Sequence, residues 1–318
     1  MAKAEARSAF STMLAHSPLV SSPDAELDPG FEVQEPGVLA SPLVFSSPHS
    51  GSVYPNRFLQ TVRLDAMALR RSEDAYVDAL FGFARASGGP LLRALFPRAY
   101  LDVNREPYEL DPRMFDGRLP SFANTRSLRV AGGLGTIARI VGESQEIYAR
   151  RFPVEDALAR IEGLYKPYHR MLHRLVQRAS ARFGLAVLID CHSMPSSAAG
   201  PELLGEDRGR ADIILGDRYG TSCDPAMTAL VEDELRRRGY IVRRNKPYAG
   251  GFITEHYGHP ASGTHALQIE VNRALYMDER NLLRHAGFVE ISRNLDDSLR
   301  VLADFALSGL GYHRAAAE

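Results

Sequence analysis

Residues 184–194 read GLAVLIDCHSM, and this segment decides how the rest of the chain is interpreted. The apolar run Gly184–Ile189 predicts the entry and body of a buried strand. It ends abruptly in reactive side chains, which are Asp190, Cys191 and His192. In α/β proteins, ligands bind beyond the carboxyl ends of the strands. His192 therefore stands where functional side chains are found, although a structural histidine beside a capping aspartate fits the same pattern.

The same order, an apolar strand followed by polar side chains, recurs along the chain. Predicted strands are Pro42–Ser46 before His49, Tyr100–Val103 before Asn104-Arg105, and Ala266–Val271, which carries Gln268 and Glu270 on one face. Helices are predicted over residues 72–88, 153–183, 225–238 and 278–307. The alternation of strands and helices indicates an α/β fold with a mostly parallel sheet covered on both faces.

The longest predicted helix, residues 153–183, has two features of interest. It contains Pro167, which is expected to kink or break it, because proline lacks an N–H and crowds the preceding turn. It also carries His169 and His173 one turn apart, each next to an arginine. We interpret these histidines as a solvated or partly buried helix face rather than as a metal-binding pair.

The domain organisation follows from length and composition. A chain of 318 residues can form one large α/β domain or two small ones. Residues 1–30 are rich in Ala, Ser and Pro, and are expected to form an N-terminal arm, either loose or a short surface helix. No linker composition divides the remainder, so residues 31–318 are expected to form a single catalytic domain.

Composition also limits the partners and the compartment. The net charge is −1, which predicts no binding to nucleic acid or to an anionic membrane. No apolar run reaches the roughly 18 residues of a membrane span. Two cysteines and the lack of an apolar secretory core favour a reducing cytoplasm. Neither a G-x-G-x-x-G after the first strand nor a P-loop is present, which argues against dinucleotide and P-loop chemistry.

Histidines and carboxylates at the predicted strand and helix ends suit a catalytic zinc site. Such a site needs three N or O ligands and one open position for water, whose pKa the metal lowers toward ~7. His49, Asp74 and His192 are the candidate ligands, and Glu270 is the candidate base that moves the proton. Glu73 is the alternative to Asp74. The spacing itself is not diagnostic, so structural roles for these residues stay open at this point.

Five motifs occur in order over about residues 43–285. They are Pro48-His49-Ser50-Gly51 with Tyr54-Pro55, Asp102-Val103-Asn104-Arg105, Asp190-Cys191-His192-Ser193, Gly250-Gly251-Phe252-Ile253-Thr254, and Gln268-Ile269-Glu270 followed by Tyr276-Met277-Asp278-Glu279. Together they resemble the N-formylglutamate amidohydrolase family. The resemblance implies a three-layer α/β/α sandwich around a mixed sheet, similar to that of the zinc carboxypeptidases.

The resemblance also implies an activity and a metal site. The activity is hydrolysis of the amide of an N-acyl amino acid, in the first place N-formyl-L-glutamate to L-glutamate and formate, within amino-acid catabolism such as histidine degradation. His49, Asp74 and His192 match the ligands of Zn²⁺ or another divalent ion. Glu270 matches the general base.

The substrate contacts are implied by the same resemblance. Asn104 and Arg105 resemble the pair that holds a substrate carboxylate, which the planar fork of an arginine fits. Arg273 is a second candidate for a carboxylate. His256 or Arg105 is expected to donate to the oxyanion that forms on the acyl oxygen.

Two positions differ from the family pattern. Met194-Pro195 stands where members often carry an arginine, and Glu255-His256 stands in place of Arg-His. Both changes remove a cation, so the acyl amino acid stays open. The alternatives are a carboxypeptidase-like peptidase or deacylase of other N-acyl amino acids, and a non-catalytic binding protein that retains the fold. The sequence leaves the oligomeric state open.

Overall fold

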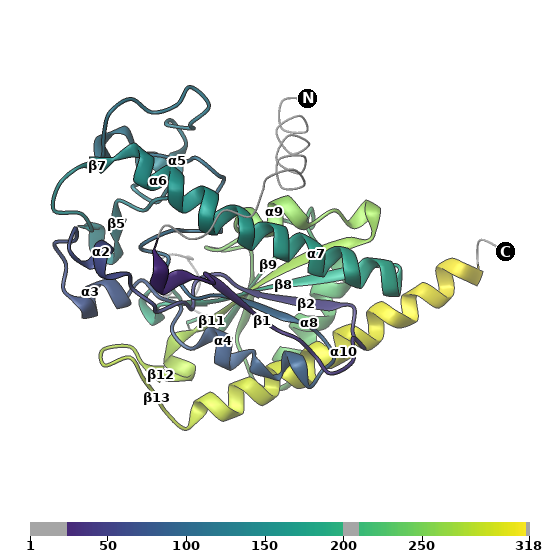
Figure 1. The fold of residues 1–318 in the computed structure, drawn as a ribbon. Coiled ribbons are helices and arrows are strands. Elements are labelled where there is room, and N and C mark those ends of the chain that lie inside the picture. Colours follow the sequence, from purple (N-terminus) through teal and green to yellow (C-terminus); the bar gives the residue numbers. More distant parts are fainter. Residues whose placement is uncertain (1–23, 200–209, 316–318) are drawn as a thin grey trace. The chain divides into compact units, whose positions relative to one another are not determined.

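The computed structural model describes residues 24–199 and 210–315 of the chain (Figure 1). Its central element is a seven-stranded sheet with strand order β1-β3-β2-β8-β11-β9-β10. The strands are β1 (Phe31–Gln34), β2 (Leu43–Ser47), β3 (Leu91–Ala94), β8 (Ala186–Met194), β9 (Ile213–Gly216), β10 (Val242–Arg244) and β11 (Thr264–Asn272). Strand β8 is parallel to β2 and β11, whereas β9 is antiparallel to β11 and parallel to β10. The predicted mixed, mostly parallel sheet is confirmed.

Helices and two-residue strand pairs make up the other regular elements. The helices are α2 (Asn56–Leu59), α3 (Ala66–Arg70), α4 (Val77–Leu80), α5 (Leu128–Ala131), α6 (Val154–Arg160), α7 (Lys166–Phe183), α8 (Pro225–Arg237), α9 (Phe252–Tyr257) and α10 (Gly287–Ala315). The small strand pairs are β4 (Phe115–Asp116) with β7 (Phe152–Pro153), β5 (Ile140–Val141) with β6 (Gln145–Glu146), and β12 (Met277–Asp278) with β13 (Leu283–Arg284). Within the described ranges, none of these helices has the length and apolar character that a membrane crossing requires.

The chain divides into two compact units. The described parts of the first unit are residues 24–32, 48–75 and 93–173, and those of the second are 33–47, 76–92, 174–199 and 210–315. A single catalytic domain over 31–318 stays a prediction. Most of the predicted N-terminal arm, 1–30, lies outside the described residues.

The second unit contains the most deeply buried strands. All nine residues of β8 are buried, and eight of the nine residues of β11 are buried. Helix α10 packs on α8 and α4. Within this unit the end of α7 lies on one side of the sheet and the α8–α10 pair on the other (Figure 1). Covering both faces explains why β8 reads as a continuous apolar run rather than an alternating one.

The segment Tyr100–Val103 is not the strand that its apolar residues predicted. Tyr100 N–H donates to Pro97 O at 2.9 Å, and Asp102 N–H donates to Thr136 O at 2.9 Å. His169 Nε2 lies 2.8 Å from Val103 O. The backbone groups are therefore satisfied by a turn, a loop and a side chain instead of a neighbouring strand. The side chains are buried all the same, which is why the segment resembled a strand.

Two predicted helices have other bounds. The helix expected over residues 72–88 is only α4 followed by the 3-10 turn Gly82–Arg85, because Tyr76 adopts a left-handed backbone with φ 66° directly before it. The helix expected from residue 278 begins at Gly287 instead. The residues before it form the β12–β13 hairpin. The spacing of apolar residues in the sequence does not distinguish this hairpin from the first turns of a helix.

The predicted helix 153–183 is present, but it widens rather than breaks. A π-turn, Ile161–Tyr165, joins α6 to α7 directly before Pro167. Proline removes one helical hydrogen bond and crowds the carbonyl four residues earlier, and a wider turn accommodates both. The expectation of a solvated or partly buried face is wrong for His169, which is fully buried on α7, and is confirmed for His173, which is partly buried.

Candidate functional site

His192 lies near the carboxyl end of β8 and is oriented by a residue of its own strand. Asp190 is two residues earlier on the same face, and its Oδ2 lies 3.0 Å from His192 Nε2. Cys191, between them, points to the opposite face. Burial and the nearby Asp190 raise the pKa of the Cys191 thiol well above its usual range. A thiol of this kind is a poor nucleophile, so the chemistry of this strand belongs to the histidine.

Glu270 lies beside His192 in the sheet. The two residues are register partners of the parallel strands β11 and β8. Glu270 is 7% exposed, and its Oε1 accepts a hydrogen bond from Gln268 Nε2 at 2.9 Å. Arg273 follows β11 directly, is buried, and donates from Nε to Ser193 Oγ at 3.2 Å. The second unit thus places a carboxylate and a guanidinium next to the residues that end β8.

His49 lies in the first unit, two residues after β2 ends. Its Nε2 lies 2.7 Å from Asp102 Oδ1, and its Nδ1 lies 3.5 Å from Asp74 Oδ2. The Asp74 N–H also donates to the His49 carbonyl at 3.0 Å. All three side chains are almost fully buried. Backbone and side-chain contacts therefore hold Asp74 against His49.

The neighbouring carboxylate, Glu73, is engaged elsewhere. Its Oε1 accepts hydrogen bonds from Tyr54 Oη at 2.8 Å and from Arg70 Nε at 3.2 Å. Burial, followed by the charge of Glu73, raises the pKa of Tyr54, so this tyrosine stays a protonated donor. Of the two candidate carboxylates, Asp74 is the one directed to the histidine.

Asp102 connects His49 to a group of cations. Its Oδ2 lies 2.9 Å from Arg98 Nη2 and 3.7 Å from Arg105 Nε. Burial by itself would raise the pKa of Asp102, but His49, Arg105 and Arg98 together hold it well below its usual range. Asp102 is therefore an ionised partner for His49. No local sequence pattern predicts this contact, because the two residues are 53 positions apart in the chain.

Arg105 presents a fixed cation. Its Nε donates to Leu134 O at 2.9 Å and its Nη1 to Asn104 O at 3.0 Å. Burial lowers the pKa of Arg105 to about 10, while Asp102 opposes that shift. The guanidinium consequently stays charged at neutral pH and is held by main-chain oxygens rather than by a flexible partner.

His256 lies on α9, which packs against β11. Its ring stacks on Phe252 with centroids 5.1 Å apart and meets the Tyr257 ring in an edge-to-face geometry with centroids 4.9 Å apart. The next residue back, Glu255, forms an ion pair with Arg218 at 2.9 Å. These ring contacts hold His256 on the helix, and Arg218 neutralises the charge of Glu255.

Three predicted ligands form a group that could hold a metal ion. His49, Asp74 and His192 each offer one ligand atom, and these atoms lie within 4.8 Å of one another. Two imidazoles and one carboxylate are a donor set of catalytic zinc sites. Each histidine also directs Nε2 at a buried carboxylate, as metal-binding histidines commonly do. The residues present therefore fit a divalent metal.

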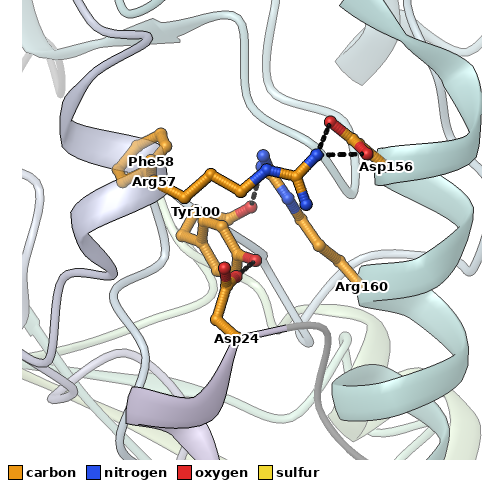
Figure 2. A pocket seen from close by; sticks show the side chains of 6 residues that line it. All are labelled: Asp24, Arg57, Phe58, Tyr100, Asp156 and Arg160. Atoms are coloured by element: carbon orange, nitrogen blue, oxygen red, sulfur yellow. Dashed lines mark hydrogen bonds and ion pairs between the residues drawn. The ribbon is translucent and has the colours of Figure 1, made fainter.

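A small cavity in the first unit lies between α2, α6 and the residues around Tyr100 (Figure 2). It is lined by Asp24, Arg57, Phe58, Tyr100, Asp156 and Arg160, with a volume of about 20 Å³. That is room for a single water molecule and far below the size of a substrate pocket. Its charged groups also pair with one another, as Arg57 does with Asp156 at 2.8 Å. We interpret this cavity as structural.

Fold and side chains together define a class, that of α/β enzymes with a histidine–carboxylate site following parallel strands. A solved structure of N-formylglutamate amidohydrolase from Ralstonia eutropha JMP134 is similar, with 39% identity, a TM-score of 0.82, and coverage of 88% of this chain and 99% of that one. A gene product of Agrobacterium tumefaciens is 16% identical with a TM-score of 0.63, covering 89% of this chain and 96% of its own, and supports the fold alone.

The chain belongs to the N-formylglutamate amidohydrolase family, whose model matches residues 41–277. Curated relatives from Pseudomonas aeruginosa and Pseudomonas putida, both named N-formylglutamate deformylase, are each 31% identical over 242 residues. These matches cover 75% of this chain and 83% and 82% of the relatives. The predicted family, and the predicted class of a hydrolase acting on amide bonds, are confirmed.

Proposed function

We propose that this chain is a metal-dependent deformylase that converts N-formyl-L-glutamate and water to L-glutamate and formate. Membership of the family supports the reaction class. The observation that carries the metal dependence is the group of His49, Asp74 and His192. The proposed ion is Zn²⁺, and the donor set also admits other divalent ions.

The proposed mechanism divides the work between the metal and the protein. A bound zinc ion lowers the pKa of water toward ~7 and polarises an acyl carbonyl. Glu270 acts as general base, taking a proton from the attacking water and returning it to the leaving amine. Its position in register with His192 supports this role, because it places the carboxylate beside a proposed ligand.

Arg105 and Asn104 are proposed to hold a substrate carboxylate. A guanidinium fixed by two main-chain carbonyls fits this role, because little conformational freedom is lost when the substrate binds. Arg273 is the second candidate. His256 is proposed to donate to the oxyanion, supported by the ring contacts that fix it on α9.

A second candidate function is hydrolysis of another N-acyl amino acid. It is favoured by Glu255, whose ion pair with Arg218 offers an acidic residue and a cation where the family often has an arginine. Met194, fully buried at the end of β8, is the other departure from the family pattern. The amide chemistry is the same in both proposals, and they differ in the side chain recognised.

The test is formate release by purified protein with and without added zinc. N-formyl-L-glutamate, N-formyl-L-methionine and N-acetyl-L-glutamate are compared at equal concentrations. Zinc-dependent formate from the glutamate substrate alone is the expected result. Activity on another substrate only would move the specificity and retain the mechanism. Protein that holds no zinc and gains no activity from added metal would instead support a non-catalytic binding protein.

The role of Glu270 is tested by Glu270→Gln, which keeps the shape of the side chain and removes the base. We expect turnover to fall by roughly 10²-fold or more, the usual contribution of general acid–base catalysis. Zinc content, measured by elemental analysis, should not change. Full activity in this variant would remove Glu270 from the mechanism. The cytoplasmic location and a role in histidine degradation stay predictions.

A further inference from the structure

Gln268 is a buried amide of β11 that the reaction scheme does not yet use. It is 4% exposed and lies two residues before Glu270 on the same face of the strand. Its Nε2 donates to Glu270 Oε1 at 2.9 Å, and its Oε1 accepts from the Gly251 N–H at 2.8 Å. Both ends of the amide are therefore engaged, one by the proposed base and one by the loop before α9.

The partner at Gly251 determines which way the amide faces. A main-chain N–H only donates, so the atom of Gln268 that meets it must be the oxygen. The NH₂ group is consequently directed at Glu270. A donor at this distance stabilises an ionised carboxylate and fixes one of its oxygens. A base that must accept a proton repeatedly gains from being held in one orientation.

The loop that supplies the Gly251 N–H is itself tightly fixed. Gly216 is the register partner of Gln268, and a Cβ there would lie 2.8 Å from Gly250 N, so only glycine allows the loop to approach. Gly250 has φ +119°, which disfavours other residues. Thr254 Oγ1 donates to Gly251 O at 2.9 Å, closing the turn into α9. The Gly251 N–H is therefore a rigid anchor for the amide.

We propose that Gln268 is a positioning residue for Glu270, anchored by the Gly251 N–H of the loop that approaches Gly216 closely. This inference rests on the proposed function, since it concerns the base of that reaction. It gives the glycine loop a role in catalysis that does not require the loop to touch substrate. It also explains why a polar amide stands in the otherwise apolar centre of β11, where a satisfied amide is tolerated and an unsatisfied one is costly.

The experiment is a double-mutant cycle on holoenzyme, with kcat and KM measured by formate release. Gln268→Met keeps an unbranched side chain of similar length and removes both hydrogen bonds. Gln268→Glu keeps the acceptor for the Gly251 N–H, replaces the donor, and brings a second carboxyl group next to Glu270. Each is made in the wild-type chain and in Glu270→Gln. Thr228→Val, which removes a buried hydroxyl from α8 in the same unit, is the control for general loss of stability.

In the wild-type chain we expect both Gln268 variants to lower kcat about 10- to 100-fold, the range for losing a hydrogen bond to a charged group. The KM and zinc content of the Gln268 variants should stay within about twofold of the wild-type values, and so should the kcat of Thr228→Val. In the Glu270→Gln chain, Gln268→Met should change the residual kcat by no more than about twofold, because the group it positions is already absent.

Other outcomes separate this inference from the proposed function. Full activity of Glu270→Gln overturns the role of the base, and with it the role of Gln268. If Glu270→Gln lowers kcat strongly and Gln268→Met keeps the wild-type kcat, the positioning role of Gln268 is overturned and the role of the base is not. An equal loss in both backgrounds shows a general structural effect and also overturns it. Crystal structures of Gln268→Met and Thr228→Val give a readout independent of activity. The Glu270 carboxylate should move in Gln268→Met and should not move in Thr228→Val.

Discussion

The two histidines of the candidate metal group are held in different ways. His192 lies on β8, and Asp190, its carboxylate partner at 3.0 Å, is two residues away on the same strand. His49 lies in the loop after β2, and Asp102, its partner at 2.7 Å, is 53 residues away. The pleat of a buried strand enforces the first pair. The second pair depends on tertiary structure and on the arginines beside Asp102.

This difference has a consequence for mutation. The strand pair should tolerate loss of the carboxylate without loss of the fold, because β8 is paired on both sides. The loop pair is part of a charge cluster, so loss of Asp102 leaves cations without their shared partner.

The largest effect is expected from the ligands themselves. His49→Asn and His192→Asn should each lower kcat/KM by about 10³-fold, since metal catalysis contributes several kcal/mol and each 1.36 kcal/mol is tenfold. Zinc content by elemental analysis should fall in both. If either variant kept full zinc content and activity, that histidine would not be a ligand. The comparison of two metal-binding histidines would then no longer hold.

The carboxylate partners come next. Asp102→Asn and Asp190→Asn should each weaken zinc binding about 10- to 100-fold, the usual cost of removing a group that orients a ligand. A competition titration with a chelator measures this. Thermal unfolding should distinguish the two variants. Asp102→Asn should lower Tm more than Asp190→Asn does, because Arg98 and Arg105 lose their anionic partner. Equal Tm values would contradict the distinction between strand and loop.

The two candidate arginines give a smaller effect on binding. Arg105→Lys should raise KM for N-formyl-L-glutamate about tenfold while kcat changes less, because an ammonium cannot reproduce the bidentate fork. Arg273→Lys should raise KM less, because Arg273 is the second candidate for the substrate carboxylate. Initial rates over a range of substrate concentrations decide the order. The reverse order would place the substrate carboxylate at Arg273.

The smallest effect concerns Glu109 in the first unit. Its Oε2 is buried and makes no hydrogen bond within the described residues, and burial raises its pKa despite Ser127, Arg129 and Arg105, with Glu106 adding to the rise. The folded protein therefore holds this proton more tightly than the unfolded chain, and stability falls as pH rises above the ordinary value of 4.5. Glu109→Gln should raise Tm by a few degrees at pH 8 and not at pH 4. An equal gain at both pH values would rule out titration as the cause.

The sequence predicted the parts of the fold and site that depend on local pattern. The apolar run Gly184–Ile189 and the two-residue spacing of Gln268 and Glu270 were sufficient to place β8 and β11. The sequence also placed Asp190 and His192 at the end of β8. The predictions that were wrong concern features that depend on residues far apart in the sequence. Tyr100–Val103 is as buried as a strand, but its backbone hydrogen bonds are not made to a neighbouring strand. The contact of Asp102 with His49 had no sequence signal for the same reason.

The π-turn Ile161–Tyr165 has a consequence for sequence comparison. Such a turn carries about one residue more than an α-helix over the same rise, and each residue turns the helix by about 100°. Arg160, the last residue before it, stacks over the Tyr100 ring at 4.0 Å and donates to Tyr148 Oη at 2.8 Å. A relative with a regular helix here should therefore align with a one-residue gap inside 161–165. An ungapped alignment would pair Arg160 with a residue facing a different side of the helix.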